Sequence, residues 1–284
     1  MTNTNYKNAV FVCDLDGTLL DADATLPPDA VRHLNILHDR GVKVTFATAR
    51  TIKSAKYILE GVPTPYPVSL MNGVLLCDLS HGEENYISAA YIDEDSYHAV
   101  QKRLAESSVT PFVYSLENGK LVTSYTKISN DYMENFMRER VEKYNKPFTK
   151  LRDGETPPGR AIYFAAMGEE NLICAANEAC LRVPKIRTAC YRDAYAKDIW
   201  YLEVFSEEAS KRRAANDIRK ATDAPYIVAF GDNYNDVPMF EGADEAYAVD
   251  GAPDGVVAAA KGVVPSAAMC GVTRKIGSLT GVEL

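Results

Sequence analysis

Residues 10–20 read VFVCDLDGTLL, and this stretch decides the fold class because an apolar run ends directly in acidic residues. Other runs of the same form occur in the chain, and a polar residue or a glycine follows each. The runs are residues 10–13 before Asp14, 42–47 before Thr48, 68–71 before Asn72, and 226–230 before Gly231 and Asp232. Such runs are typical of parallel strands buried on both faces, and ligands lie beyond the carboxyl ends of these strands. We therefore expect the polar residues to share one site.

Helical segments separate these runs. One begins at Pro28 and ends at Gly41, a second covers residues 52–60 before Gly61, and a third covers residues 211–221. Glycine is common directly after the last residue of a helix, which supports the first two ends. The alternation of strands and helices predicts an α/β fold with a doubly wound, mainly parallel sheet, that is, a Rossmann-like core.

The middle of the chain has a different pattern. Its expected elements are helices at 94–106, 131–144 and near 172–181, strands at 86–91, 161–166, 186–191 and 199–205, and a hairpin of 111–114 with 121–125 around Asn118-Gly119. Hairpins combined with helices predict an α+β insert with an antiparallel sheet. Residues 1–82 and 207–284 would form one domain, and residues 83–206 would form a second domain inserted into it.

Composition restricts the class of partner. The chain has 39 acidic residues against 31 lysines and arginines, and a net charge of −8 disfavours nucleic acid as a partner. No apolar run is long enough for a membrane span, and the first residues lack a signal-peptide pattern. The six cysteines form no C-x-x-C pair and are expected to be free thiols. We expect a soluble cytoplasmic protein that is a monomer or homodimer.

The acidic pair in DLDGT indicates a metal site. Asp14 and Asp16 follow a buried strand, where two carboxylates are costly unless a positive group lies between them. Mg²⁺ prefers a few carboxylates together with phosphate and water oxygens. Gly17 allows a sharp turn that directs backbone N–H groups toward an anion.

The string VFVCDLDGTLL resembles the first motif of the haloacid dehalogenase (HAD) superfamily of phosphohydrolases, and three further motifs follow in the order that this superfamily has. Thr48 in FATAR is similar to the second motif, Lys211 in EEASKRRAA to the third, and Asp232 with Asp236 in GDNYND to the fourth. The insert between the second and third motifs is similar to the large α/β cap of the Cof-like branch.

The resemblance implies a Mg²⁺-dependent phosphatase that hydrolyses a small phosphorylated metabolite, a sugar phosphate or similar phosphomonoester. Asp14 would be the nucleophile that forms an aspartyl-phosphate, and Asp16 would be the general acid and then the base. Thr48 would donate a hydrogen bond to a phosphoryl oxygen, and Lys211 would place a positive charge on Asp14 and the phosphoryl group. Mg²⁺ would be held by Asp14, the backbone carbonyl of Asp16, and Asp232.

Further residues are candidates for holding the substrate or supporting the site: Arg50, Asn72, Gly73, Asn235 and Asp236. Arg50 would hold the substrate or help to close the cap. Asp236 would orient Lys211 or a metal-bound water, and Asn235 would bond the phosphoryl site or Lys211, although both can equally cap the helix that begins near residue 237.

The chain departs from the Cof-like pattern beside two of its motifs. Ala49 stands where that branch usually has glycine, and Ala209 and Arg212 replace its usual valine and glycine around the lysine. None of these changes removes a catalytic group. They weaken any inference about the substrate, because the approach of Arg50 and the return from the cap can differ.

Other functions fit the same skeleton. A sugar-phosphate mutase would use the same aspartyl-phosphate, and a regulatory sugar-phosphate binder would share the fold without the chemistry. The residues that contact the leaving group would come from the cap, where residues 152–155 or 191–195 are candidates, although a solvent-facing connection is the simpler interpretation of both.

Overall fold

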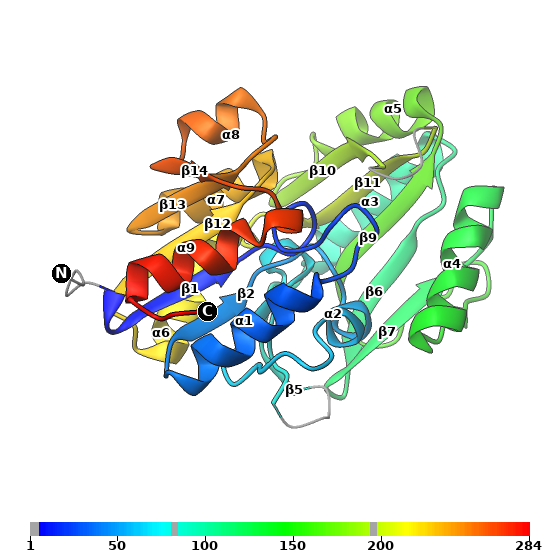
Figure 1. Ribbon diagram of the computed structural model, residues 1–284. Helices are drawn as coiled ribbons and strands as arrows, with labels where there is room; N and C mark the ends of the chain where they lie inside the picture. The colour runs from blue at the N-terminus through cyan, green and yellow to red at the C-terminus, as the bar shows by residue number, and fades with distance from the viewer. Residues whose placement is uncertain (1–5, 81–84, 194–197) are drawn as a thin grey trace. The chain divides into compact units, whose positions relative to one another are not determined.

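The computed structural model describes residues 6–80, 85–193 and 198–284, and it divides into two compact units (Figure 1). The first unit contains Met1–Ser88 and Ser210–Leu284, and the second contains Ala89–Ala209. The sequence predicts borders at 82/83 and 206/207. The assignment of a catalytic role to one part and a cap role to the other stays a prediction.

A five-stranded sheet forms the centre of the first unit. Its order is β14-β13-β12-β1-β2, and every neighbouring pair is parallel. The strands are β1 (Ala9–Cys13), β2 (Lys43–Phe46), β12 (Tyr226–Gly231), β13 (Glu245–Val249) and β14 (Gly262–Val264). All residues of β1 are buried, as expected for a strand with helices on both faces. The predicted parallel sheet is confirmed.

Helices cover both faces of this sheet. They are α1 (Pro28–Asp39), α2 (Ile52–Ile58), α6 (Lys211–Thr222), α7 (Val237–Gly242), α8 (Asp254–Ala258) and α9 (Gly271–Thr280). Val10 and Val12 pack against Ile218 of α6 and Met239 of α7, so one face of β1 is covered by these helices. The alternating residue Phe11 faces the other side, where α1 and α9 pack together (Figure 1).

The run at 68–71 differs from the prediction of a full parallel strand. Only Val68–Leu70 forms β3, which joins β2 through a single parallel bridge between Ala47 and Ser69. β3 instead pairs antiparallel with β4 (Leu75–Asp78), and β5 (Asn85–Ala89) completes a three-stranded sheet. The 3₁₀ helix η2 (Met71–Gly73) ends β3 early and returns the chain to β4, which explains the short strand.

The second unit is an α+β domain with a six-stranded sheet of order β10-β11-β9-β6-β7-β8. Its strands are β6 (Phe112–Glu117), β7 (Lys120–Tyr125), β8 (Thr149–Lys150), β9 (Arg160–Gly168), β10 (Ile186–Arg192) and β11 (Trp200–Ser206). The pairing is antiparallel, as predicted, except that β8 lies parallel to β7, so the sheet is mixed.

Helices pack on both faces of this second sheet. They are α3 (Glu94–Glu106), α4 (Asp131–Tyr144) and α5 (Glu170–Cys180). Val100 of α3 and Ile173 of α5 pack with Phe164 of β9 on one face. On the other face, Phe136 of α4 stacks on Phe112 of β6 with ring centroids 5.5 Å apart. The ends of α3 and α4 agree with the predicted ranges.

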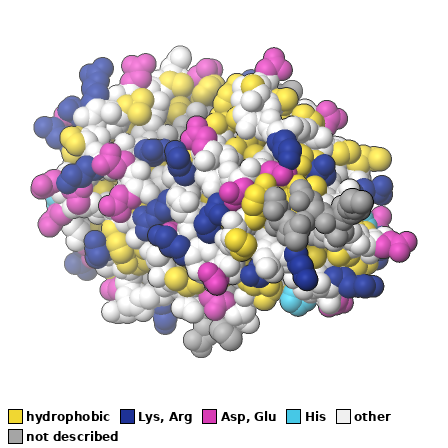
Figure 2. Space-filling view, turned by 90° about the vertical axis from the view of Figure 1, so that its left-hand side faces the viewer, with side chains coloured by type: hydrophobic (Ala, Val, Ile, Leu, Met, Phe, Trp, Pro, Cys, Tyr) yellow, Lys and Arg dark blue, Asp and Glu magenta, His cyan; other side chains and the backbone are white. Residues whose placement is uncertain are grey.

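The surface shown in Figure 2 carries acidic and basic side chains interspersed with small groups of hydrophobic ones. Within the described ranges, no helix has both the length and the apolar character that a bilayer crossing requires. The six cysteines are all free thiols, as predicted.

A buried carboxylate at the amino end of β13 joins the N-terminal segment to the sheet. Glu245 accepts hydrogen bonds from Tyr6 at 2.9 Å, Tyr226 at 3.1 Å, Tyr247 at 2.9 Å and Lys261 at 2.6 Å. Burial alone would raise the pKa of Glu245, but these hydrogen bonds outweigh burial and hold the pKa below its usual value. The ionised carboxylate therefore stabilises the fold.

Replacing Glu245 with glutamine is expected to lower the free energy of unfolding by about 2 kcal/mol at pH 7, because charge-assisted hydrogen bonds are lost. A group with a lowered pKa contributes stability above its unfolded pKa, and loses this contribution as the pH falls through its folded pKa. The difference between variant and wild type should therefore shrink toward pH 3 in urea denaturation. Glu241→Gln, which breaks an exposed pair with Arg212, is the control with little effect. An equal difference at both pH values would contradict the prediction.

Candidate active site

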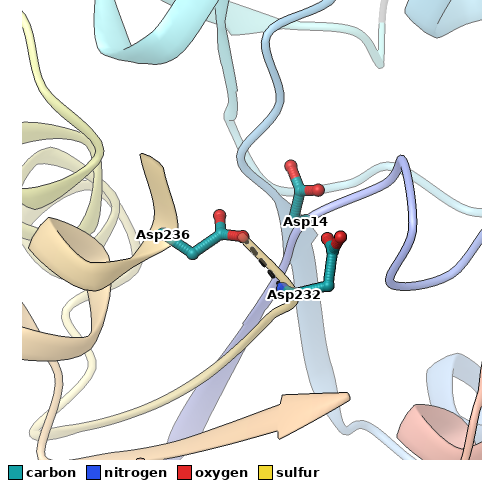
Figure 3. Close-up of side chains that lie close together, drawn as sticks. All are labelled: Asp14, Asp232 and Asp236. Carbon is teal, nitrogen blue, oxygen red and sulfur yellow. Dashed lines mark hydrogen bonds between the residues drawn. The ribbon is translucent and has the colours of Figure 1, made fainter. Parts of the chain in front are cut away.

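Two aspartates lie side by side where β1 and β12 end. The backbone N–H of Asp14 donates to Phe230 O at 3.0 Å, so the first residue after β1 is held beside the last residues of β12. Asp232 follows β12 directly, and carboxylate oxygens of Asp14, Asp232 and Asp236 lie within 4.8 Å of one another. Figure 3 shows the three side chains in this arrangement.

A buried lysine reaches this cluster from the start of α6. Ser210 caps the helix, and its hydroxyl oxygen accepts a hydrogen bond from Arg213 N. Lys211 is therefore the first helical residue, and its Nζ contacts Asp14 Oδ1 at 2.6 Å and Asp236 Oδ1 at 2.5 Å. Its side chain is 1% exposed, so this ion pair is shielded from water.

Asp236 is fully occupied by protein groups. One oxygen faces Lys211, and the other accepts hydrogen bonds from the backbone N–H groups of Asp232 and Asn233, both at 3.0 Å. Figure 3 shows the bond from Asp232. A Cβ on Gly231 would lie 2.4 Å from Asp236 Cγ, so only glycine fits there. Asp236 thus fixes Lys211 and the turn after β12, which leaves Asp14 and Asp232 as the carboxylates that can bind a cation.

Thr18 orients Asp232, a contact that the sequence interpretation missed. Its hydroxyl donates to Asp232 Oδ1 at 2.9 Å, and Thr18 is fully buried. Gly17 has a φ of +75°, and a Cβ there would lie 2.2 Å from Asp232 Oδ2. The only signal in the sequence is the position of threonine directly after the glycine of DLDGT.

The charges of the cluster are unbalanced. Burial raises the pKa of Asp14 well above its usual range, and Asp236 and Asp232 add to this shift although Lys211 opposes it. Burial, together with the carboxylate of Asp236, raises the pKa of Asp232 to about 6. Burial disfavours the charged form of Lys211, but Asp14 and Asp236 outweigh it and hold its pKa above its usual value. One ammonium does not neutralise three carboxylates, so the cluster favours a further cation.

Thr48 and Arg50 extend the site from the end of β2. Thr48 is buried, its Oγ1 accepts a hydrogen bond from Arg50 N at 3.2 Å, and its hydroxyl proton is donated to no other residue that the structure describes. Arg50 Nε and Nη2 contact the two oxygens of Asp16 at 2.7 and 2.5 Å. Arg50 Nη1 also donates to Ser54 Oγ at 2.8 Å. Arg50, which is predicted to hold substrate or help to close the cap, therefore makes a bidentate contact with Asp16.

Asn72, Gly73 and Asn235 lie next to these elements. The side chain of Asn235 donates to Asn72 Oδ1 at 3.3 Å, and Gly73 approaches the backbone of Ser210. The first unit thus brings the site residues predicted within it to the carboxyl edge of its parallel sheet.

The structure describes residues 152–155 and part of 191–195, the two segments that are candidates for contacting the leaving group. Residues 152–155 form a turn in which Arg152 N donates to Glu155 Oε2 at 2.8 Å, and their side chains are exposed. Tyr191 donates to Glu203 Oε1 at 2.9 Å, whereas residues 194 and 195 lie outside the described residues.

The donor set fits a hard divalent cation. Asp14 and Asp232 each have one oxygen bonded to a protein group, Lys211 and Thr18 respectively, and within the described part of the chain the second oxygen of neither accepts a hydrogen bond. Carboxylate and carbonyl oxygens are the ligands that Mg²⁺ prefers, and no thiol or imidazole lies in the cluster.

The chain forms a parallel α/β sheet with carboxylates and one lysine at its carboxyl edge, and an α+β unit is inserted in the sequence between the parts of that fold. These features define the class of Rossmann-like enzymes with an inserted domain. The family model for haloacid dehalogenase-like hydrolases matches residues 11–276, and the chain belongs to this family. The predicted resemblance is confirmed, and the second compact unit lies between the second and third motifs, as a Cof-like cap does.

A curated relative is MG265 of Mycoplasma genitalium, which is named as a candidate phosphatase. The two sequences are 27% identical over 140 residues, covering 45% of this chain and 49% of MG265. The match thus spans about half the length of that relative.

Solved structures resemble the chain over almost its whole length. BT1666 of Bacteroides thetaiotaomicron, from a study of HAD phosphatases, has a TM-score of 0.74 at 17% identity, covering 100% of this chain and 98% of its own. TM0651 of Thermotoga maritima has a TM-score of 0.74 at 21% identity, covering 95% and 97%. The HAD subclass IIB sugar phosphatase BT4131 has a TM-score of 0.74 at 19% identity, covering 97% and 100%. At these identities the likeness shows the fold alone.

Proposed function

We propose that the protein is a Mg²⁺-dependent phosphatase that hydrolyses a small phosphorylated metabolite through an aspartyl-phosphate on Asp14. The observation that carries the proposal is the contact of the buried Lys211 ammonium with Asp14, beside a second carboxylate, Asp232, at the ends of adjacent parallel strands. Family membership and the phosphatase name of MG265 support the same reaction.

In the first step, a carboxylate oxygen of Asp14 attacks phosphorus, and the bond from phosphorus to the ester oxygen of the substrate breaks. Asp16 donates a proton to that oxygen, so the leaving group departs as a neutral alcohol. Arg50 donates to both oxygens of Asp16, so one of these two contacts would have to open before that oxygen can carry the proton.

In the second step, water attacks phosphorus and gives a proton to Asp16, and the bond between phosphorus and Asp14 breaks. Inorganic phosphate leaves, and both carboxyl groups return to their starting states. Release of inorganic phosphate, in place of an isomeric phosphate ester, distinguishes this reaction from that of the mutase that shares the skeleton.

Charge stabilisation comes from groups that surround Asp14. Lys211 places its ammonium on the nucleophile, and the hydroxyl of Thr48 would donate to a phosphoryl oxygen. Asp14, Asp232 and the backbone carbonyl of Asp16 would hold Mg²⁺. When bound, this ion supplies the positive charge that lets one anion approach another.

For the substrate class, we propose a sugar phosphate or a similar phosphomonoester. The shared fold with the sugar phosphatase BT4131 supports this class. A screen of phosphorylated metabolites for phosphate release would identify the compound.

Removing the metal is expected to stop hydrolysis of an aryl phosphate, and adding Mg²⁺ should restore it. Mg²⁺ should also raise the melting temperature, since it binds the folded protein only. Asp232→Asn should abolish both effects of Mg²⁺. Because burial raises the pKa of Asp232, the charged carboxylate destabilises the metal-free fold above the unfolded pKa. The variant should therefore melt about 3 °C higher than metal-free wild type at pH 7.5.

Spectrophotometric assays and thermal scans, each with chelator or Mg²⁺, measure these effects. Hydrolysis that continues at full rate in chelator would overturn the metal-dependent mechanism.

A further inference from the structure

The turn that ends β3 has an unusual backbone. Met71, Asn72 and Gly73 follow one another with φ angles of 53°, 56° and 88°. Residues with a side chain seldom adopt this left-handed region, and successive examples persist only where the surroundings impose them. Such backbone conformations cluster at functional sites, and this turn (the 71–73 turn) lies among the site residues described above.

The 71–73 turn is anchored to the end of β2. The backbone N–H of Met71 donates to Arg50 O, and the backbone N–H of Asn72 donates to Thr48 O, both at 3.2 Å. Thr48 N in turn donates to Ser69 O at 3.0 Å. The turn and the segment that carries Thr48 therefore form one hydrogen-bonded unit.

The opposite side of the turn lies directly against the start of α6. A Cβ on Gly73 would lie 2.2 Å from the carbonyl oxygen of Ser210 and 3.1 Å from its backbone nitrogen. These are backbone atoms, which cannot move aside as a flexible side chain can. Ser210 caps α6, and Lys211 is the next residue, so the contact fixes the residue from which the lysine side chain extends.

We propose that the 71–73 turn is a positioning element for Lys211. The turn fixes the start of α6 relative to the end of β2. Gly73 sets the distance between the turn and α6, because it lets the backbone of the turn contact the backbone of Ser210. The turn touches no reacting group in this role and acts through Lys211. The inference rests on the proposed function, because it assumes that contact between Lys211 and Asp14 is needed for catalysis.

The chain offers a matched control for a substitution at Gly73. Gly61 has a φ of +78°, close to the +88° of Gly73, but nothing lies within 4 Å of a Cβ built there. Gly61→Ala therefore reproduces the backbone strain without the collision. Gly73→Ala is expected to lower kcat about 100-fold, because small displacements of a catalytic group have effects of this size, whereas Gly61→Ala should leave kcat within about twofold.

A double-mutant cycle tests whether the effect passes through Lys211. Binding of orthovanadate with Mg²⁺ is measured by calorimetry for wild type, Gly73→Ala, Lys211→Met and the double variant. Gly73→Ala should weaken binding about tenfold in wild type and less than about twofold in the Lys211→Met background. A purely structural role would weaken binding equally in both backgrounds and would overturn the inference.

If Gly73→Ala does not fold, Asn72→Ala takes its place in the same cycle. This change removes the contact with Asn235 and places alanine at a left-handed position that asparagine adopts more readily, so it loosens the turn without a collision at Gly73. A loss that vanishes in the Lys211→Met background supports the inference, and a loss that persists there overturns it. If wild type neither hydrolyses aryl phosphates nor binds vanadate, the proposed function fails and the inference fails with it. An active wild type with equal losses in Gly73→Ala and Gly61→Ala refutes the inference alone.

Discussion

Replacing Asp14 with asparagine is expected to abolish hydrolysis of an aryl phosphate, with kcat lower by about 10⁴-fold or more. An amide is a poor nucleophile toward phosphorus, and the covalent step then has no substitute. The fold should persist, because asparagine has nearly the same shape and removes one charge from an overcrowded acidic cluster. Initial rates, together with circular dichroism of the variant, measure both parts of this prediction.

Asp250 provides the matched control for this substitution. It follows β13, so it also stands at the carboxyl edge of the parallel sheet, but it is exposed and lies outside the acidic cluster. Asp250→Asn should keep full activity. Full activity in Asp14→Asn would refute the assignment of the nucleophile. A labelled phosphoryl group trapped on the acid-quenched wild type, and absent from the variant, would support the covalent intermediate.

Replacing Lys211 with methionine is expected to damage both stability and activity. Its Nζ contacts Asp14 and Asp236, whose side chains are 7% and 0% exposed, and removal leaves buried carboxylates without their cation. Breaking a buried pair in this way costs about 3–5 kcal/mol, which lowers the melting temperature by roughly 10 °C. The variant also lacks the ammonium that contacts Asp14, and this loss should lower kcat by about 10³-fold.

Two further variants separate these effects. Lys220→Met removes an exposed lysine from the last turn of the same helix and should change neither quantity. Asp236→Asn combined with Lys211→Met removes one of the stranded charges and should recover part of the melting temperature but none of the activity. A Lys211→Met protein that keeps its wild-type melting temperature and kcat would contradict the role of the lysine in the cluster.

Several elements could be predicted from the sequence because their signals are local. The apolar strands β1 and β12 end in acidic residues, and the parallel pairing of these strands brings Asp14 and Asp232 together. The helix at 131–144 has a capping asparagine before it, Asn130, whose side chain accepts from Met133 N. Lys211 at the start of α6 follows from its capping serine. Patterns of this kind depend on neighbours a few residues away.

Other features depend on contacts that no local pattern contains. The predicted third parallel strand is mostly replaced by the β3–β4 pair, because the 71–73 turn reverses the chain. Arg50 contacts Asp16, which is 34 residues away in the sequence, and its expected role in holding substrate or closing the cap stays a prediction. Thr18 reaches Asp232 across 214 residues. Each of these contacts exists only after the sheet has assembled.

The sequence by itself determined the class of the enzyme, the order of its motifs and the identities of the acids and the lysine. The reason is that residues close together in the sequence specify buried strands and helix caps. The tertiary structure decided how those groups pair with one another. Asp236 accepts hydrogen bonds from Lys211 and two backbone N–H groups, whereas among the described residues Asp14 and Asp232 each bond through one oxygen only. The physical reason is that burial and pairing set the charge of a carboxylate, and both depend on residues that meet only in the folded chain.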